Sequence, residues 1–411
     1  MFNLLNVLNQ FNYIESLSEK VASHEDIVDL SLTIIRSEKD FTVKVAAAEV
    51  IADLVVNSKK LYSSSNLLEV VVLEVIMEAT FQSSPISYRR ETLRALQNLS
   101  YANANEVLTS TNYQNMISAL LMNLQCDDDE LRRLSIGTIW NLSKDSQMKE
   151  RVCEAVLLIL TQALFDTDVE VRQSTMHALR SFSRHDSTAM QLLNCSNLMK
   201  DLSTVISNDT SRKMKVAGAK VLRDLSDLSC TPQMHLTYDY YVDAVICSAS
   251  GCDEMVLPII ADVLVMQTST TMTEEGNMNI LINHIGVYET ISLIASTNSE
   301  EDIIKIEKII SSMTAYFECH KELIEYSILP TIIHLGLIAG NKSIVVDKFV
   351  LRILHFFVEC SVESTINIAE ITGVVDFLFE CAKRMEDTRW RILALEILEI
   401  LIISWKEQTY E

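Results

Sequence analysis

Glycine, proline and aromatic residues are scarce in this sequence. The 411-residue chain contains 8 glycines and 4 prolines, and aromatic residues make up only 7% of it. Because β-rich domains need many turns, and turns depend on glycine and proline, this scarcity argues against a β protein and favours long helices. Hydrophobic residues nevertheless account for 48% of the chain, which is enough for a continuous core. We therefore expect an all-α protein.

Positive charge is also in short supply, and the net charge is −22. Residues 1–230 hold 29 acidic and 23 basic side chains, a balance of −6, whereas residues 231–411 hold 27 and 11, a balance of −16. A surface of this kind repels nucleic acids and anionic membranes. The acidic excess fits either a basic partner or simply the solubility of a long exposed surface.

The sequence shows no segment that would direct the protein into or across a membrane. The first 20 residues have neither a basic leader nor an unbroken apolar stretch, so we expect no signal peptide and no secretion. The longest apolar run, Ile392–Trp405, is interrupted by Glu396 and Glu399 and is too short to span a bilayer. The nine cysteines include no Cys-x-x-Cys pair. We therefore expect reduced cysteines and a reducing compartment, the cytoplasm or the nucleus.

Catalytic and cofactor-binding motifs are missing from the sequence. It contains no phosphate-binding loop, zinc-protease motif, serine-hydrolase elbow or dinucleotide-binding fingerprint. The eight histidines show no metal-ligand spacing. Cys247 and Cys252 bracket a small-residue turn, CSASGC, which fits incidental thiols better than a thiol site. We expect a protein that is not an enzyme and requires neither a metal nor a cofactor.

What the sequence does contain is a repeated unit of about 40 residues. Within residues 127–186, an acidic turn followed by a helix occurs twice. Apolar helices open at matching points with intervals of 41, 46, 42, 43, 43, 46, 41 and 46 residues, at Glu25, Asn66, Asn112, Glu154, Asn197, Tyr240, Gly286, Ser327 and Gly373. Such regularity is the signature of a helical solenoid. We predict about nine repeats over residues 25–411, a capping helix over 1–24, and a polar hinge or insertion loop over 267–279.

Several phrases resemble the armadillo repeat family, of which the HEAT repeats are a near relative. They are Leu164–Ser183 (LFDTDVEVRQSTMHALRSFS), Glu325–Pro330 (EYSILP) and Ile371–Val375 (ITGVV). The resemblance covers residues 25–404 and is clearest over 88–229. It implies a right-handed superhelix with three helices per repeat, in which the third helices line a concave groove that binds extended peptides. The implied function is that of a non-enzymatic scaffold or adaptor holding an extended segment of another protein.

The resemblance also implies which side chains would line the groove. In peptide-binding members, an asparagine on the third helix bonds the backbone of the ligand, and a carboxamide can donate to and accept from an extended peptide. In the first five units this position holds Asp53, Asn98, Asn141, Ser181 and Asp224. The alternative interpretation is that these are ordinary polar residues on an exposed helix face.

The position one turn upstream bears on the class of ligand. Nuclear-import adaptors carry tryptophan there, whereas this chain has Arg94 in the second unit and Gly137 in the third, which argues against an import role. Arg94, His177 and Lys220 would make part of the groove positive and suited to acidic ligands. The local charge thus favours an acidic ligand and the net charge a basic one, and the sequence leaves this choice open.

The last expected helix, residues 388–405, is apolar around most of its circumference and includes Trp390, Leu398, Ile402 and Trp405. Because solenoid ends normally carry a polar outer face, we expect that this end packs on a partner or a second copy of the chain, is covered by its own repeat, or was cut from a longer chain. It supports a second hypothesis, a cytoskeletal or ciliary assembly subunit held through its convex face and its C-terminal helix.

Overall fold

The computed structural model confirms the all-α prediction. It describes residues 25–57, 84–102, 107, 113–145, 149–229, 238–250, 254–269, 280–282, 284–297, 299–317, 329–339, 342–360, 365 and 368–409, and the regular elements within these residues are α-helices. The capping helix predicted over residues 1–24 lies outside the described residues. Among the described helices, none is both long and apolar enough to cross a membrane.

The chain divides into two compact units, Met1–Asn197 and Leu198–Glu411. The first contains α3 (Glu25–Ser37), α4 (Phe41–Asn57), α6 (Ile86–Ala102), α8 (Tyr113–Leu124), α9 (Asp129–Leu142), α10 (Lys149–Ala163), α11 (Val169–Ser183) and α12 (Asp186–Leu193). Helix α13 (Ser196–Asn208) spans the boundary. The second contains α14 (Arg212–Ser229), α15 (Tyr238–Ser250), α16 (Leu257–Ser269), α18 (Ile285–Ser296), α19 (Glu300–Phe317), α20 (Leu329–Ala339), α21 (Ile344–Cys360), α23 (Val374–Arg384) and α24 (Thr388–Thr409).

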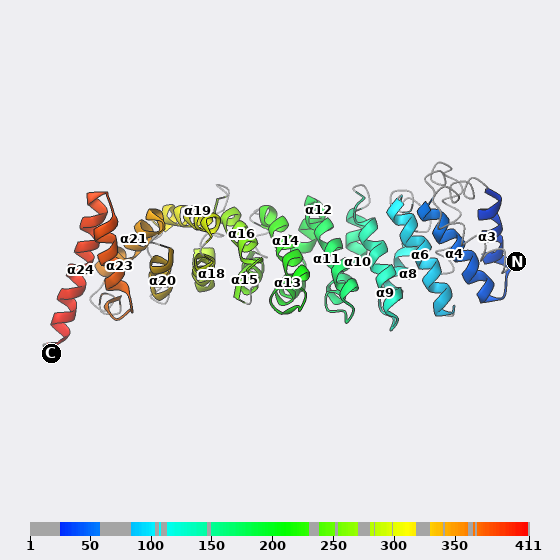
Figure 1. The fold of residues 1–411 in the computed structure, drawn as a ribbon, viewed down its shortest axis with the longest axis horizontal. Helices are drawn as coiled ribbons and strands as arrows, with labels where there is room; N and C mark the ends of the chain where they lie inside the picture. The colour runs from blue at the N-terminus through cyan, green and yellow to red at the C-terminus, as the bar shows by residue number, and fades with distance from the viewer. Residues whose placement is uncertain are drawn as a thin grey trace. The chain divides into compact units, whose positions relative to one another are not determined.

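Within each unit the helices are stacked in two rows (Figure 1). In the first unit, α4, α6, α9 and α11 pack on one another in chain order, and α8 packs on α10. In the second, α14, α16, α19, α21 and α24 form one row, and α15, α18, α20 and α23 form the other. Because each helix contacts mainly the adjacent helices of its own row and of the facing row, each unit is built as a solenoid. We call the row α4–α6–α9–α11 the third-helix row of the first unit.

Acidic turns begin the third helices and also join successive repeats. Asp128 caps α9 by accepting a hydrogen bond from the backbone N–H of Leu131, and Asp168 caps α11 in the same way. Arginines on the preceding helix of the row bind the same carboxylates. Arg90 of α6 binds Asp128, and Arg133 of α9 binds Asp168. The hydrogen bond from Arg90 lowers the pKa of Asp128. Each of these aspartates therefore fixes where its helix starts. Its bridge to an arginine holds that helix against the preceding helix of the row.

Arg132 makes the most enclosed of these connections. Its side chain is 10% exposed and donates to both carboxylate oxygens of Asp166, at 2.8 and 3.0 Å, while the side chain of Asp166 is 12% exposed. The same guanidinium donates to Asp129 at 2.6 Å and to the backbone oxygen of Cys126 at 3.0 Å. The hydrogen bonds to Asp166 raise the pKa of Arg132. One buried guanidinium thus ties α9 to the turn that precedes α11.

Two boundaries differ from the prediction. Helix α10 begins at Lys149, earlier than the expected Glu154. Gln267, Thr268 and Ser269, predicted to begin a polar loop, are the last turn of α16. The helix continues because Gln267 is buried and its Nε2 donates to the backbone oxygen of Ser226 at 2.9 Å. Residues 270–279 of that predicted loop lie outside the described residues.

Candidate functional site

The third-helix row of the first unit exposes a group of aromatic and basic side chains. We call it the aromatic-basic cluster, and it consists of Tyr101 at the end of α6, Trp140 on α9, Lys144 just beyond α9 and His177 on α11. The rings of Trp140 and His177 are stacked, with centroids 4.8 Å apart and planes at 21°. The ammonium of Lys144 lies 4.3 Å from the Trp140 centroid and 5.6 Å from that of Tyr101. One cation therefore faces two aromatic rings contributed by successive repeats.

This cluster is open to solvent. Tyr101 is 78% exposed, His177 and Lys144 are exposed, and Trp140 is half-buried. Trp140 and Lys144 are four residues apart, so they fall on the same side of the chain as it leaves α9. The cluster is therefore a surface of flat rings around an ammonium group rather than part of the core.

The electrostatic environment of the cluster is positive. Burial lowers the pKa of His177, and the neighbouring charges of Arg180 and Lys144 lower it further. Burial also lowers the pKa of Lys144. A neutral imidazole is consequently favoured at neutral pH, and an anion is the kind of group that this surface attracts.

Asn98 and Asn141, predicted to hold a ligand, bond the preceding helix of the row. The Nδ2 of Asn98 donates to the backbone oxygen of Ala52 at 2.8 Å. The Nδ2 of Asn141 donates at 3.2 Å to the backbone oxygen of Gln97 and to Oγ of Ser100, and Asn141 is only 6% exposed. These N–H groups join successive repeats, and the ligand-binding role of both residues stays a prediction.

The other predicted residues of the first unit are also engaged within the protein. The Oγ of Ser181 donates to the backbone oxygen of Ser143 at 2.7 Å, so it occupies the same structural position as the two asparagines. Arg94 lies 2.7 Å from Glu91 and 3.5 Å from Asp53. Burial raises the pKa of Asp53. Of the predicted residues in this unit, His177 belongs to the aromatic-basic cluster, and Asn141 contacts it by accepting a hydrogen bond from Lys144 at 3.2 Å.

Lys220 and Asp224 lie on α14 in the second unit and are both half-buried. Asp224 lies 3.9 Å from Arg223 on the same helix. For Lys220, no ion pair with another described residue is seen. These two positions stay predictions for that unit taken by itself.

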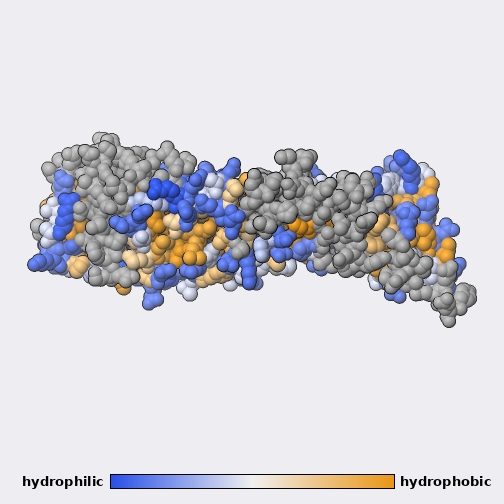
Figure 2. Space-filling model, turned by 180° about the vertical axis from the view of Figure 1, so that it is seen from behind, coloured by the Kyte–Doolittle hydropathy of each residue, from blue (hydrophilic) through white to orange (hydrophobic). Residues whose placement is uncertain are grey.

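Some of the residues predicted to form a surface at the C-terminal end are buried and others are exposed. Leu398 is buried, whereas Ile402 is 48% and Trp405 is 65% exposed on α24. Trp390 is half-buried beneath Lys348 and Arg352 of α21, whose charged groups lie 5.5 and 5.2 Å from its ring. Figure 2 shows hydrophobic residues on the surface at this end of the chain. An apolar surface therefore remains at the C-terminal end, but Trp390 and Leu398 contribute little to it.

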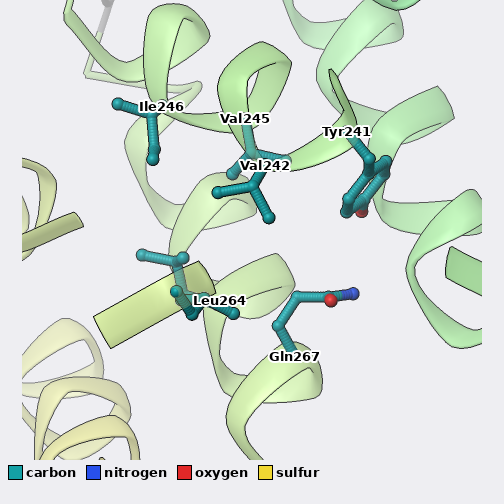
Figure 3. Close-up of a pocket in the computed structure, with 7 residues that line it drawn as sticks. Tyr241, Val242, Val245, Ile246, Leu264 and Gln267 are labelled. Carbon is teal, nitrogen blue, oxygen red and sulfur yellow. The ribbon is translucent and has the colours of Figure 1, made fainter. Parts of the chain in front are cut away.

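A small apolar cavity in the second unit does not offer a ligand site. Its volume is about 10 Å³, and Figure 3 shows its lining, which is Tyr241, Val242, Val245, Ile246, Leu264, Gln267 and Leu281. A space of this size holds at most a single water molecule. In the described residues, no group of three His, Cys, Asp or Glu side chains is arranged to hold a metal ion.

Sequence reasoning did not single out Lys144 or Tyr101 as site residues. Each lies two residues beyond a buried leucine of the row, Leu142 in α9 and Leu99 in α6, so they hold the same position in successive repeats. Trp140 packs against a neighbouring helix of the row through the ring of His177. The repeat register was the signal that could have found the two missed residues.

Comparisons with known proteins agree with the fold. No family model and no curated protein sequence matches this chain. Its structure is similar to that of an engineered protein, with a TM-score of 0.57 and 14% identity over 97% of this chain and 94% of the other. It is also similar to a computationally designed armadillo repeat protein for modular peptide recognition, with a TM-score of 0.49 and 13% identity over 58% of this chain and 98% of the other. With its two stacked rows of helices, the chain is an all-α solenoid.

Proposed function

We propose that this protein is a non-enzymatic, protein-binding scaffold that holds an extended segment of a partner along the third-helix row of its first unit. The observation that supports this proposal is the aromatic-basic cluster, in which rings from α6 and α9 face Lys144 and the His177 ring of α11 stacks on Trp140. Aromatic side chains are enriched at protein interfaces because they bury a large area at a small entropic cost. A row of repeats offers an extended segment one such contact after another.

The residues of the row have distinct roles in this proposal. Trp140 and His177 supply a flat surface, and Tyr101 extends it to the preceding repeat. Asn98 and Asn141 keep the helices in register through their N–H groups, while their side-chain oxygens can accept from a ligand. The Oδ1 of Asn141 already accepts from Lys144 at 3.2 Å, so a ligand would compete there.

The test is an affinity pull-down from native extract that compares the wild-type chain with the Trp140→Ala/His177→Ala variant. We expect a partner captured by the wild type to be lost by the variant, because the stacked rings are removed while every inter-repeat hydrogen bond is kept. Limited proteolysis of the complex followed by mass spectrometry should leave one short protected segment of the partner.

The matched control is Tyr240→Ala, which removes a ring that is 53% exposed on α15, in the other row of the second unit. Circular dichroism establishes that all variants are folded. Equal capture by the wild type, the double variant and the control would rule out the proposed surface. Asn98→Ala and Asn141→Ala are poorer probes, because each also removes an inter-repeat hydrogen bond, which is worth about 1 kcal/mol.

A second candidate function, an assembly subunit, is favoured by the apolar surface of α23 and α24. Its exposed side chains are Val375, Phe379, Ile392, Leu395, Ile402, Ile403 and Trp405, with exposed fractions between 43% and 65%. Contiguous apolar surface of this kind marks interaction sites. If it joins two copies of the chain, sedimentation velocity should show a dimer that Leu395→Glu/Ile402→Glu converts to a monomer. A wild-type monomer at every concentration tested would exclude self-association.

A further inference from the structure

We propose that the bound segment is acidic and that one of its carboxylates binds the ammonium of Lys144 in the aromatic-basic cluster. This inference rests on the function proposed above and names the chemistry of the partner. It selects between the two ligand classes that the sequence leaves open, a basic segment attracted by the net charge and an acidic segment attracted by the local charge.

The ammonium of Lys144 contacts aromatic rings and an amide oxygen rather than a carboxylate, although Asp145 is the next residue in the sequence. This ammonium faces the rings of Trp140 and Tyr101 and donates to the amide oxygen of Asn141 at 3.2 Å. No carboxylate of a described residue forms an ion pair with it, and burial lowers its pKa. An ammonium without an ion pair gains from a ligand carboxylate, because the carboxylate accepts a hydrogen bond from the ammonium more strongly than the neutral amide oxygen of Asn141 does.

Three arginines of the same row are already paired with carboxylates of the protein, unlike Lys144. Arg90 pairs with Asp128, Arg94 lies 2.7 Å from Glu91, and Arg133 pairs with Asp168. An acidic ligand would have to break an internal ion pair to bind any of these three. At Lys144 it would displace only the contact with an amide oxygen.

Several positive charges lie close to the aromatic-basic cluster of this acidic protein. Arg180 and Lys144 together disfavour the charged form of His177, and the ammonium of Lys149 is held nearby by the backbone oxygen of Ser181 at 3.2 Å. The chain as a whole carries −22. A local positive surface on a negative protein attracts an acidic segment at short range and directs where on the surface it binds.

Exposed carboxylates along the row favour a protein segment over a nucleic acid as the ligand. Glu130 and Glu170 lie beside the arginines of the row, and their side chains are 53% and 65% exposed. A nucleic acid carries a phosphate at every nucleotide and would meet these carboxylates, whereas a peptide can place one carboxylate at Lys144 and uncharged groups elsewhere. Uncharged side chains on either side of that carboxylate would cover the rings of Trp140 and His177.

The experiment uses three fluorescein-labelled peptides of equal length that repeat Glu-Leu-Gly, Gln-Leu-Gly or Lys-Leu-Gly. Fluorescence anisotropy at low ionic strength should show that the full chain binds the glutamate peptide about tenfold tighter than the glutamine peptide. The Lys144→Gln variant should lose this preference, and the lysine peptide should bind most weakly. Lys39→Gln is the matched control, since Lys39 is an exposed lysine in the turn between α3 and α4.

Four outcomes would overturn the inference. They are equal binding of the glutamate and glutamine peptides by the wild type, an unchanged preference in Lys144→Gln, no binding of any of the peptides, and a single-stranded oligothymidylate that binds more tightly than the glutamate peptide. The proposed function is judged separately. A partner that is captured by the wild type and lost by Trp140→Ala/His177→Ala would keep the binding surface even if the ligand proves not to be acidic.

Discussion

Replacing Arg132 with methionine should lower the free energy of unfolding by about 3 to 5 kcal/mol, the usual cost of leaving one partner of a buried ion pair alone. Without the guanidinium, the carboxylate of Asp166 loses two hydrogen bonds at a place where its side chain is only 12% exposed. The backbone oxygen of Cys126 loses a donor as well. Urea unfolding of the wild type and the variant, followed by circular dichroism, measures this loss.

The neighbouring arginine provides the control for this prediction. Arg133 makes the corresponding bridge to Asp168, but its side chain is 43% exposed, so water can replace it. We expect Arg133→Met to cost less than about 1 kcal/mol. Adding Asp166→Asn to Arg132→Met should recover part of the stability, because the unpaired charge is removed. A loss below about 1 kcal/mol for Arg132→Met alone would contradict a connecting role for this arginine.

The second large effect should be a dependence of stability on pH that originates at Asp347. This residue is fully buried on α21, and burial raises the pKa of its carboxyl to about 6 despite the opposing charge of Arg384, to which it is bonded. The pKa of an unfolded aspartate is about 3.9, so the folded state binds the proton more strongly. As the pH rises from about 4 to 6, the contribution of this carboxyl to the free energy of unfolding should therefore fall by about 2 to 3 kcal/mol.

The Asp347→Asn variant isolates this contribution, since all other titrating groups cancel in the difference between the two proteins. Its free energy of unfolding should rise relative to that of the wild type by about 2 kcal/mol as the pH increases from 4 to 6.5. If the free energy of unfolding of the wild type instead rises relative to that of the variant, the ion pair with Arg384 has a larger effect on the pKa of Asp347 than burial has. A flat difference would mean that the two influences cancel.

The predicted architecture was recoverable because its causes are local. An Asp followed by an apolar helical pattern begins a helix, and the same order of residues returns every 41 to 46 positions. Asp128 and Asp168 confirm the capping function that this pattern indicates. The boundary of α16 was misplaced for a reason that is not local, because buried Gln267 bonds a helix about 40 residues earlier in the chain.

The candidate site was harder to predict from the sequence than the fold. The family resemblance directed attention to Asn98 and Asn141, yet their N–H groups bond the preceding helix of the row. His177 was selected for its charge, whereas the structure shows it as a ring stacked on Trp140. Position within a repeat identifies which residues lie on a face, but not whether their polar groups are already satisfied by a neighbouring repeat.

By itself, the sequence determined that this chain is helical, repetitive and acidic, because helix formation, capping and net charge follow from neighbouring residues and from composition. The tertiary structure alone decided that Tyr101, Trp140, Lys144 and His177 meet on one surface. Those residues come from three successive repeats, and their distances depend on how closely α6, α9 and α11 are packed. That packing is set by the bridges from Arg90, Arg132 and Arg133 and by the side-chain amides, which act between residues 34 to 46 positions apart.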